Sequence, residues 1–356
     1  MELETKSDQC TRHINFISKG LENNSDFYIA KEDEYNDIHD LLETESMDLS
    51  GDVKLKYSRR PDLFSSYLES GQIPAIITDE KKKFLGVVSE MDISRFGECS
   101  KIYYTSDLRI SKQAGMRTRA NFRKAYLEVL KTLPNDCFTV VLKDNEKAIQ
   151  ALTRNQSDLY YNKVYEYLSR AILILPSINF LPEPKHNLEI VEGSDDNFKS
   201  NLQSRSSFSN TVSKNDKSFI IKEKGKTVAQ FSICRPALRS LFIEAQSKKK
   251  KFWLKAVKTL FSHDYERKIP WVYLTSLYLG PGQDKESVIK KIIKYLYSKK
   301  ELNTGELFLL CHGAREQLRL RLPLPQFLTY GNLYKVSDCN YTEELVEPIH
   351  LNPLSL

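Results

Sequence analysis

The segment that decides the fold is KIYYTSDLRISKQAGMRTRANFRKAYLEVLKTLPNDCFTVVLKDNEKAIQAL, residues 101–152. It begins with a run rich in aromatic and β-branched side chains, which predicts a strand. A short basic loop, residues 111–119, leads into an amphipathic helix that we expect to end near Thr132. Residues 137–143 predict a buried strand, and residues 145–152 open a second helix. The order is therefore strand, loop, helix, strand, helix.

The turn from the first strand into the first helix is suited to bind an anion. The start of a helix leaves about four backbone N–H groups without helical partners, and the positive end of the helix dipole lies there. Arg117 and Arg119 add guanidinium groups, which suit phosphates. The alternative is an ordinary turn of a βαβ unit with a solvated basic loop. The loop alone does not decide between these two interpretations.

The same segment resembles the core of the GNAT acetyltransferase superfamily. In that family the loop and the helix start hold the pyrophosphate of acetyl-CoA, with the pattern Arg/Gln-x-x-Gly-x-Gly/Ala. In one register Gly115, Thr118 and Ala120 stand at the three defined places, so the first two depart from the pattern. A shifted register puts Gly115 in the glycine place. Glycine there lets the backbone approach the phosphates closely.

The second helix of the segment is similar to the family's Asn-x-x-Ala-x-x-x-Tyr element. Asn145 and Ala148 match, while Leu152 stands where the family has Tyr. This match favours the GNAT interpretation of the loop. The resemblance implies that the first strand splays from the next parallel strand, and that acyl-CoA lies in the resulting V-shaped gap. The cofactor-binding residues that it implies are Leu108, Ile110, Gly115, Met116, Arg117, Thr118, Arg119, Ala120, Asn145 and Ala148.

The resemblance also implies the reaction, which is transfer of an acetyl group from acetyl-CoA to an amine by direct attack in a ternary complex. The amine must lose a proton and the leaving thiolate must gain one, so a carboxylate base and a Tyr acid suit the site. We select Glu90 and Asp107 as base candidates, with Asp92 as a third. Each is also consistent with a surface or paired carboxylate. Tyr160 is the acid candidate, with Tyr161 beside it.

The acceptor side of the gap is expected near residues 61–69, which predict a short helix. In GNAT enzymes the first helices line this side. Arg59, Arg60 and Tyr67 are therefore the substrate-binding candidates. A solvated pair of arginines is the alternative interpretation.

The strand before the loop presents two faces to its surroundings, because successive side chains of a strand alternate. Strict alternation puts Ser106 and Leu108 on one face. It puts Asp107 and Arg109 on the other.

The chain has 356 residues, which is enough for two domains with cores of their own. Residues 1–25 are polar without a clear period, and we expect an N-terminal arm there. Residues 26–176 are the expected acyl-CoA-binding domain, and residues 177–187 a Pro-rich linker. Residues 188–356 repeat the element order weakly. We therefore expect an α+β protein of two tandem GNAT-like domains, each a mixed, mostly antiparallel sheet flanked by helices.

The second half contains a poorer phosphate loop. Residues 238–260 are basic, and we expect them to be helical. A strand at residues 271–279 is then followed by the loop GPGQ and a helix at residues 284–299. The loop has no Arg, and Asp284 would cap the helix and repel phosphate. We therefore expect the second domain to be degenerate and non-catalytic.

The composition indicates a globular chain, because 40% of the residues are hydrophobic and there are 19 Tyr and 17 Phe. The net charge of +6 is mixed along the chain, so we do not expect a nucleic-acid partner. No stretch approaches about 18 uninterrupted apolar residues, and the N-terminus does not resemble a signal peptide, so we expect a cytoplasmic protein without a membrane partner. The six scattered cysteines lack metal-ligand spacing, which predicts reduced thiols and no metal.

Two other functions stay open beside an acyl-CoA-dependent N-acyltransferase with an unidentified amine acceptor. A non-catalytic acyl-CoA sensor or scaffold is favoured by Leu152 and by the departures in the loop. An aminoacyl transferase similar to the Fem-type ligases, which pair two GNAT folds and take aminoacyl-tRNA, would need a long basic groove. The enzyme is our first interpretation, and it rests on fold-level resemblance.

Overall fold

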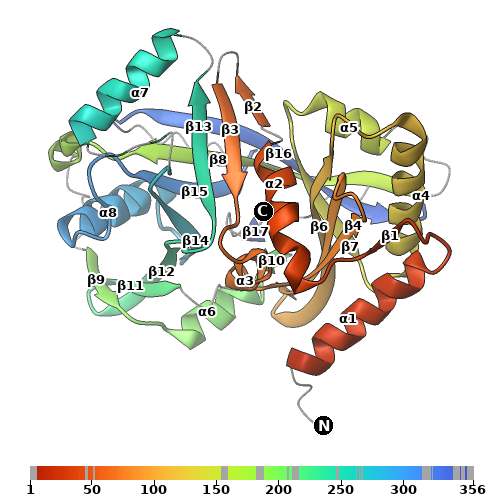
Figure 1. Cartoon of the computed structure of the whole chain (residues 1–356). Helices are drawn as coiled ribbons and strands as arrows, with labels where there is room; N and C mark the ends of the chain where they lie inside the picture. Colours follow the sequence, from red (N-terminus) through yellow and green to blue (C-terminus); the bar gives the residue numbers. More distant parts are fainter. Residues whose placement is uncertain are drawn as a thin grey trace.

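The computed structural model has two lobes that share strands (Figure 1). It describes residues 6–44, 47–50, 53–153, 159–181, 188–206, 208–210, 216–245, 248–261, 263, 265, 268–314, 322, 324–339, 345 and 349–350. The helices are α1 (Lys6–Leu21), α2 (Tyr35–Thr44), α3 (Leu63–Glu69), α4 (Met116–Thr132), α5 (Glu146–Thr153), α6 (Asp196–Gln203), α7 (Lys248–Phe261) and α8 (Lys285–Ser298), with the 3-10 helices η1 (Glu32–Glu34) and η2 (Pro176–Phe180). The strands are β1 (Phe27–Ile29), β2 (Met47–Ser50), β3 (Val53–Ser58), β4 (Gln72–Asp79), β5 (Phe84–Arg95), β6 (Glu98–Ile110), β7 (Cys137–Leu142), β8 (Tyr160–Leu173), β9 (Leu188–Glu192), β10 (Phe208–Asn210), β11 (Lys217–Glu223), β12 (Lys226–Cys234), β13 (Ser240–Ala245), β14 (Trp271–Leu279), β15 (Leu307–Gly313), β16 (Gln326–Ser337) and β17 (Ile349–His350).

The segment that decides the fold forms the expected unit, since β6, α4, β7 and α5 follow one another in that order. Helix α4 buries Phe122, Ala125, Tyr126 and Val129, a spacing that puts all four side chains on one face. This face packs in the same core cluster as Phe84 of β5. The prediction of a strand–helix–strand–helix core is confirmed.

One mixed, mostly antiparallel sheet runs through both lobes, which confirms the α+β class. Within the described residues it has 14 strands, in the order β1-β4-β5-β6-β7-β16-β8-β15-β14-β12-β11-β9, with β10 and β17 off this path. Strand β16 lies between β7 and β8, and β8 lies between β16 and β15, so each half of the chain contributes a strand beside the other half (Figure 1). We expected two separate sheets. The division at residues 177–187 stays a prediction, and the pairing joins the strands on both sides of it.

A second, three-stranded sheet also joins the halves, with the order β13-β3-β2. Strand β13 was expected to be part of a basic helix over residues 238–260. That expectation was wrong for residues 240–245, which pair with β3 antiparallel along their whole length. Helix α7 begins only at Lys248. Pairing with a strand nearly 190 residues away overrode the local helical pattern, as tertiary contacts often do for short segments.

In two pairs of parallel strands, the pairing stops after three residues. Strands β6 and β7 pair over three residues, from Tyr103 with Cys137 to Thr105 with Thr139. Strands β14 and β15 also pair over three residues, and the last pair is Tyr273 with Leu309. Beyond these pairs β6 continues to Ile110 without β7 as a partner. Helices α4 and α8 connect the two strands of each pair.

Helix α1 occupies most of the segment that we expected to be an N-terminal arm. His13 and Ile17, four residues apart, are both fully buried. Gly20 lies against α4, and a Cβ there would come within 2.5 Å of the Cα of Val129. A close helix–helix contact of this kind needs glycine at the crossing. The helix is therefore stabilised by tertiary packing, which its polar sequence did not predict.

Candidate functional site

A β-bulge in β6 lies where the pairing with β7 ends. On the β5 side, Val87 pairs with Ser106 and Leu85 pairs with Arg109, which leaves two residues of β6 opposite one residue of β5. Asp107, the first of the two, has a φ of 48°, in the left-handed region. The extra residue shifts the alternation of the strand, so Ser106 and Arg109 lie on the same face. The strict alternation that we expected was therefore wrong beyond Ser106.

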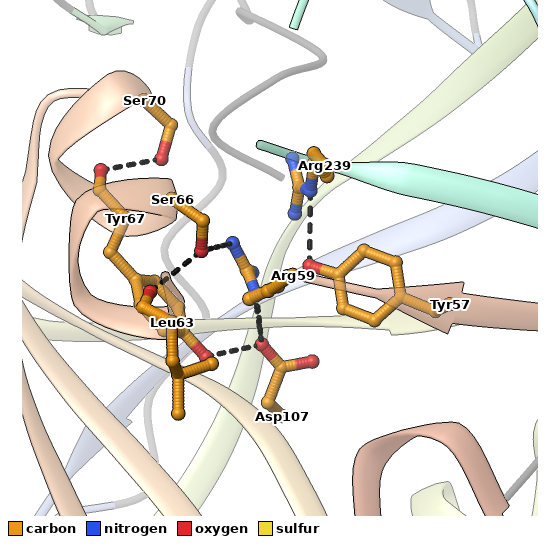
Figure 2. Close-up of polar contacts among 8 residues, drawn as sticks. All are labelled: Tyr57, Arg59, Leu63, Ser66, Tyr67, Ser70, Asp107 and Arg239. Carbon is orange, nitrogen blue, oxygen red and sulfur yellow. Dashed lines mark hydrogen bonds and ion pairs between the residues drawn. The ribbon is translucent and has the colours of Figure 1, made fainter. Parts of the chain in front are cut away.

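Asp107 forms a buried ion pair with Arg59 (Figure 2). Nη2 of Arg59 lies 2.9 Å and Nε 3.2 Å from Oδ2 of Asp107, and the Tyr67 hydroxyl donates to the same oxygen at 2.6 Å. The side chains of the pair are only 2% and 9% exposed. Nη1 of Arg59 also donates to Oγ of Ser66 at 3.3 Å. Helix α3, capped by Asp62, thus positions two partners of the ion pair.

The surroundings of Asp107 keep it ionised. Burial alone would raise the pKa of this carboxyl, but the charges of Arg59 and Arg109 and the hydrogen bond from Tyr67 outweigh burial, so the pKa lies below its ordinary value. Burial raises the pKa of the Tyr67 hydroxyl well above its ordinary value. Asp107 is therefore a carboxylate, and a weak proton acceptor, at neutral pH, whereas Tyr67 is a proton donor.

A second arginine reaches the same place from the other half of the chain. Strand β13 pairs with β3, and Ser240 lies opposite Ser58, so Arg239 and Arg59 each stand one residue outside the last pair. Nε of Arg239 donates to the Tyr57 hydroxyl at 3.0 Å (Figure 2). The guanidinium carbons of Arg59 and Arg239 lie 4.9 Å and 5.3 Å from the centre of the Tyr57 ring. Cation–π attraction therefore holds both arginines beside one ring.

These side chains line a cavity of about 390 Å³. Its wall includes residues 106–109 of β6 and residues 140–142 of β7, which follow the last pair of these strands. Of the predicted site residues, the cavity wall contains Arg59, Asp107, Leu108, Asn145 and Ala148. The structure thus brings together one base candidate, one acceptor candidate and three cofactor candidates.

The cavity wall also contains residues that the sequence did not single out. The aromatic and cationic ones among them include Tyr57, Tyr104, Tyr126, Arg239, Trp271 and Tyr273. No local signal could have indicated that Tyr57 and Arg239 meet, because 182 residues separate them. Tyr161 lines the cavity and its neighbour Tyr160 does not. Adjacent residues of a strand point to opposite faces, so of these two acid candidates Tyr161 is the one that faces the cavity.

The expected phosphate loop has an open helix start. Gly115 is the N-cap residue of α4 and supplies no side-chain hydrogen bond. A Cβ at Gly115 would have no heavy atom within 4 Å. Met116, Arg117 and Ala120 are exposed. Arg119 instead holds the loop, because its guanidinium donates to three loop carbonyl groups at 2.9 Å, 3.2 Å and 3.3 Å.

The Asn145 element combines a structural role with a place in the cavity wall. Oδ1 of Asn145 accepts a hydrogen bond from the backbone N–H of Ala148 at 3.1 Å, so this side chain caps α5. Leu152, at the family's Tyr place, also lines the cavity. Thr118 is half-buried in the first turn of α4. Ile110 packs against the core cluster around α4 instead of lining the cavity.

The remaining candidates lie away from the cavity. Glu90 is buried, and its Oε1 lies 2.6 Å from Nζ of Lys101, so it is a paired carboxylate. Arg60 is exposed and forms ion pairs with Asp40 at 2.7 Å and with Glu43 at 2.8 Å. Each of these side chains is satisfied by neighbours within its own region.

Two absences hold for the described part of the chain only. Among those residues, no three His, Cys, Asp or Glu side chains gather in a way that could hold a metal ion. The described helices include none that is long and apolar enough to cross a membrane.

Comparisons with known proteins give the fold. No family model matches the chain, and no curated protein sequence matches it. Crystal structures of Saccharomyces cerevisiae N-myristoyltransferase with bound myristoyl-CoA are similar, with a TM-score of 0.52 and 11% identity over 93% of this chain and 83% of that chain. A GCN5-related N-acetyltransferase from Anabaena variabilis gives a TM-score of 0.45 and 8% identity over 88% of this chain and 72% of that chain.

The likeness to N-myristoyltransferase supports the GNAT-like fold that residues 101–152 led us to expect. At this level of identity it concerns the fold alone. The particular chemistry of the chain has to be argued from its own side chains.

Proposed function

We propose that this chain is an acyl-CoA-dependent N-acyltransferase, which transfers an acyl group to an amine by direct attack in a ternary complex. The observation that carries the proposal is the cavity at the end of the β6–β7 pairing, lined by the last part of β6, the strand that leads into the open start of α4. The N-myristoyltransferase structures of similar fold contain bound myristoyl-CoA, which supports an acyl-CoA as the donor. Acetyl-CoA is the donor that we propose to test first, on the resemblance of residues 101–152 to GNAT enzymes.

The acyl-CoA donor would lie between β6 and β7, beyond the end of their pairing, with its pyrophosphate at the start of α4. Gly115 leaves the helix N–H groups accessible because no side chain covers them. Arg117, which is exposed on the first turn, would add a charged donor. Leu108, Asn145 and Ala148 line the cavity and would contact the pantetheine arm and the acyl group. The proposed path thus joins the loop to the cavity wall.

The bulge would stabilise the reacting thioester. A bulge leaves its extra residue outside the strand ladder, and a backbone N–H freed in this way beside Asp107 would be suited to donate to the oxygen that gains charge during attack. Burial raises the pKa of the hydroxyls of Tyr104, Tyr126 and Tyr161, so all three are proton donors at neutral pH. We propose Tyr161 as the acid that protonates the departing thiolate. Asp107, a weak base, would hold Arg59 in place while water takes the proton of the amine.

Two observations favour a second candidate, a non-catalytic protein that binds acyl-CoA. Leu152 lines the cavity at the place where GNAT enzymes have a Tyr. Asp107, the carboxylate among the described lining residues, is held in an ion pair and has a lowered pKa. A binder of this kind would hold the donor without turnover.

Calorimetric titration with acetyl-CoA, myristoyl-CoA and CoA tests both candidates. We expect binding, and we expect Arg117→Ala to weaken it by about fivefold to tenfold because one charge-assisted contact is lost. Lys285→Ala, at the start of α8, is the matched control and should bind like the unchanged chain. Release of free CoA thiol with a panel of amines then separates enzyme from binder. Absence of binding to all three ligands would overturn both candidates.

A further inference from the structure

The end of the cavity beside the small sheet carries an excess of positive charge. Among the described lining residues, the guanidinium groups are those of Arg59, Arg109 and Arg239, and the one carboxylate is Asp107. Oδ2 of Asp107 already accepts the bonds from Arg59. Cations in a partly buried site are costly unless an anion faces them. The wall is therefore complementary to an anionic group.

Two buried donors in this wall are unused. Nε of Arg109 and Oγ of Ser106 are buried and have no hydrogen-bond partner within the described part of the chain. The bulge puts both side chains on the same face of β6, on either side of Asp107. A native protein rarely leaves such groups unsatisfied in the absence of a ligand or water. Both groups are suited to donate to carboxylate oxygens.

The pyrophosphate of the donor does not account for these groups. The pyrophosphate is expected at the start of α4, and no residue of the loop at 111–119 lines the cavity among those described. Another part of the wall is apolar and aromatic and comes from the second half of the chain, with Leu241, Trp271, Tyr273 and Leu309. A cavity of about 390 Å³ has the size of a small-molecule site.

We infer that the acceptor, on the function proposed above, is a small amine with a carboxylate and an apolar or aromatic group, as in an aromatic amino acid. The carboxylate lies against Arg109 and Ser106, and the apolar group lies against Trp271 and Tyr273. The amine nitrogen then bonds to the acyl carbon, and the carbon–sulfur bond of the thioester breaks with its electron pair on sulfur. The proton that the nitrogen loses passes through solvent, and the thiolate gains a proton from a Tyr hydroxyl that solvent recharges.

Matched acceptors test the inference. L-Phenylalanine and phenethylamine, and L-tryptophan and tryptamine, differ only by the carboxylate. With acetyl-CoA as donor, we expect kcat/KM to be at least about tenfold higher for each amino acid, the effect of hydrogen bonds to a charged group. Equal or higher values for the amines without a carboxylate would overturn the inference.

Arg109→Gln identifies the residue responsible. It should raise the KM for L-phenylalanine by about tenfold to a hundredfold and leave that for phenethylamine unchanged. Arg205→Gln is the matched control, since Arg205 is an exposed arginine outside the cavity, and it should change neither value. An equal loss for both acceptors in Arg109→Gln would mean a structural role and would contradict the inference.

A binding measurement keeps the inference separate from the proposed function. N-Acetyl-L-phenylalanine and N-acetylphenethylamine are the two products, and their binding by calorimetry needs neither acyl-CoA nor turnover. We expect the first to bind more tightly, and we expect Arg109→Gln to remove the difference. Failure of acyl-CoA binding with this pattern intact would overturn only the enzyme. Absence of any preference for the carboxylated product would overturn the inference.

Discussion

Helices α4 and α8 both follow the first strand of a parallel pair, yet they begin under opposite electrostatic conditions. At α4 the N-cap Gly115 has no side-chain bond and the first turn has no acidic residue. At α8 the N-cap Asp284 accepts hydrogen bonds from the backbone N–H and the hydroxyl of Ser287 at 3.0 Å and 2.5 Å, and Glu286 follows. The first helix start remains open to an external anion, whereas the second is closed by an anion of its own.

The difference teaches how one strand–helix–strand unit can serve stability or binding. A helix start that is capped internally stabilises the fold and repels phosphate. A helix start that is left uncapped gives up this stabilisation and keeps its donors for a ligand. The strands do not share this contrast, because β14 also has a register shift, where Ser276 and Leu274 lie opposite the consecutive residues Ser232 and Ile233 of β12.

The largest effect is expected for Asp107→Ala, in β6 just beyond the end of its pairing with β7. The change leaves the buried guanidinium of Arg59 without its carboxylate, and we expect a loss of about 3–5 kcal/mol in the free energy of unfolding. Urea denaturation measures it. Glu98→Ala, at the exposed end of the same strand, should stay within about 0.5 kcal/mol. A loss below about 1 kcal/mol for Asp107→Ala would contradict the buried ion pair.

The same ion pair predicts a dependence on pH. Because the pKa of Asp107 is lowered in the folded state, its stabilisation is fully present above the unfolded value of about 3.9 and is lost as pH falls through the folded value. The gap in unfolding free energy between the unchanged chain and Asp107→Ala should therefore narrow as pH falls below about 4. Urea denaturation across this range measures the gap, and a constant gap would rule out the ionised state.

An intermediate effect is expected where the strands of the two halves meet. Gly331 of β16 lies under the ring of Tyr167, and a Cβ there would come within 2.2 Å of that ring. Gly331→Ala should displace Tyr167, which lines the cavity, and destabilise the fold by about 1–3 kcal/mol. Thermal unfolding tests this, and an unchanged midpoint would show that the ring moves at no cost.

A smaller effect is expected at the second helix start. Asp284→Ala removes the N-cap of α8 and should lower the free energy of unfolding by about 1 kcal/mol. The affinity for acetyl-CoA should not change, since we propose that the donor binds at the start of α4. Urea denaturation and calorimetry measure the two quantities. A change in affinity would move the donor site to the second half.

The smallest stability effect and the sharpest test of the comparison come from Gly115→Asp. The new side chain has open space and would cap α4 as Asp284 caps α8, so we expect a stabilisation of about 0.3 kcal/mol. It should also weaken acetyl-CoA binding by at least about tenfold, because its carboxylate would take the N–H groups and repel the pyrophosphate. Gain of stability without loss of affinity would mean that the donor does not use this helix start.

Strands β6 and β7 and helices α4 and α5 could be predicted because their sequence patterns are local. Residues 101–152 alternate between strand and helix periods with loops of ordinary length, and the structure has β6, α4, β7 and α5 there. The helix of the N-terminal segment and strand β13 could not be predicted. Both form through partners far along the chain, namely Val129 for α1 and strand β3 for β13.

The candidate site divides in the same way. Leu108, Asn145 and Ala148 belong to the segment with a recognisable pattern, and all three line the cavity. Arg239 and Tyr57 also line the cavity but lie outside that segment. They come together only through the pairing of the two halves of the chain. Asp107 is intermediate, since the sequence suggested a carboxylate and the bulge decided where its side chain lies.

The sequence by itself therefore determined the order of strands and helices in residues 101–152, the basic loop and its glycine, and the presence of a capping carboxylate in the second loop. These depend on backbone propensity and on neighbours within a few residues. Only the tertiary structure decided that one sheet joins the halves, that a bulge shifts the face of Arg109, and that three arginines meet one carboxylate in a cavity. Such contacts depend on strand register between distant segments, which local patterns do not specify.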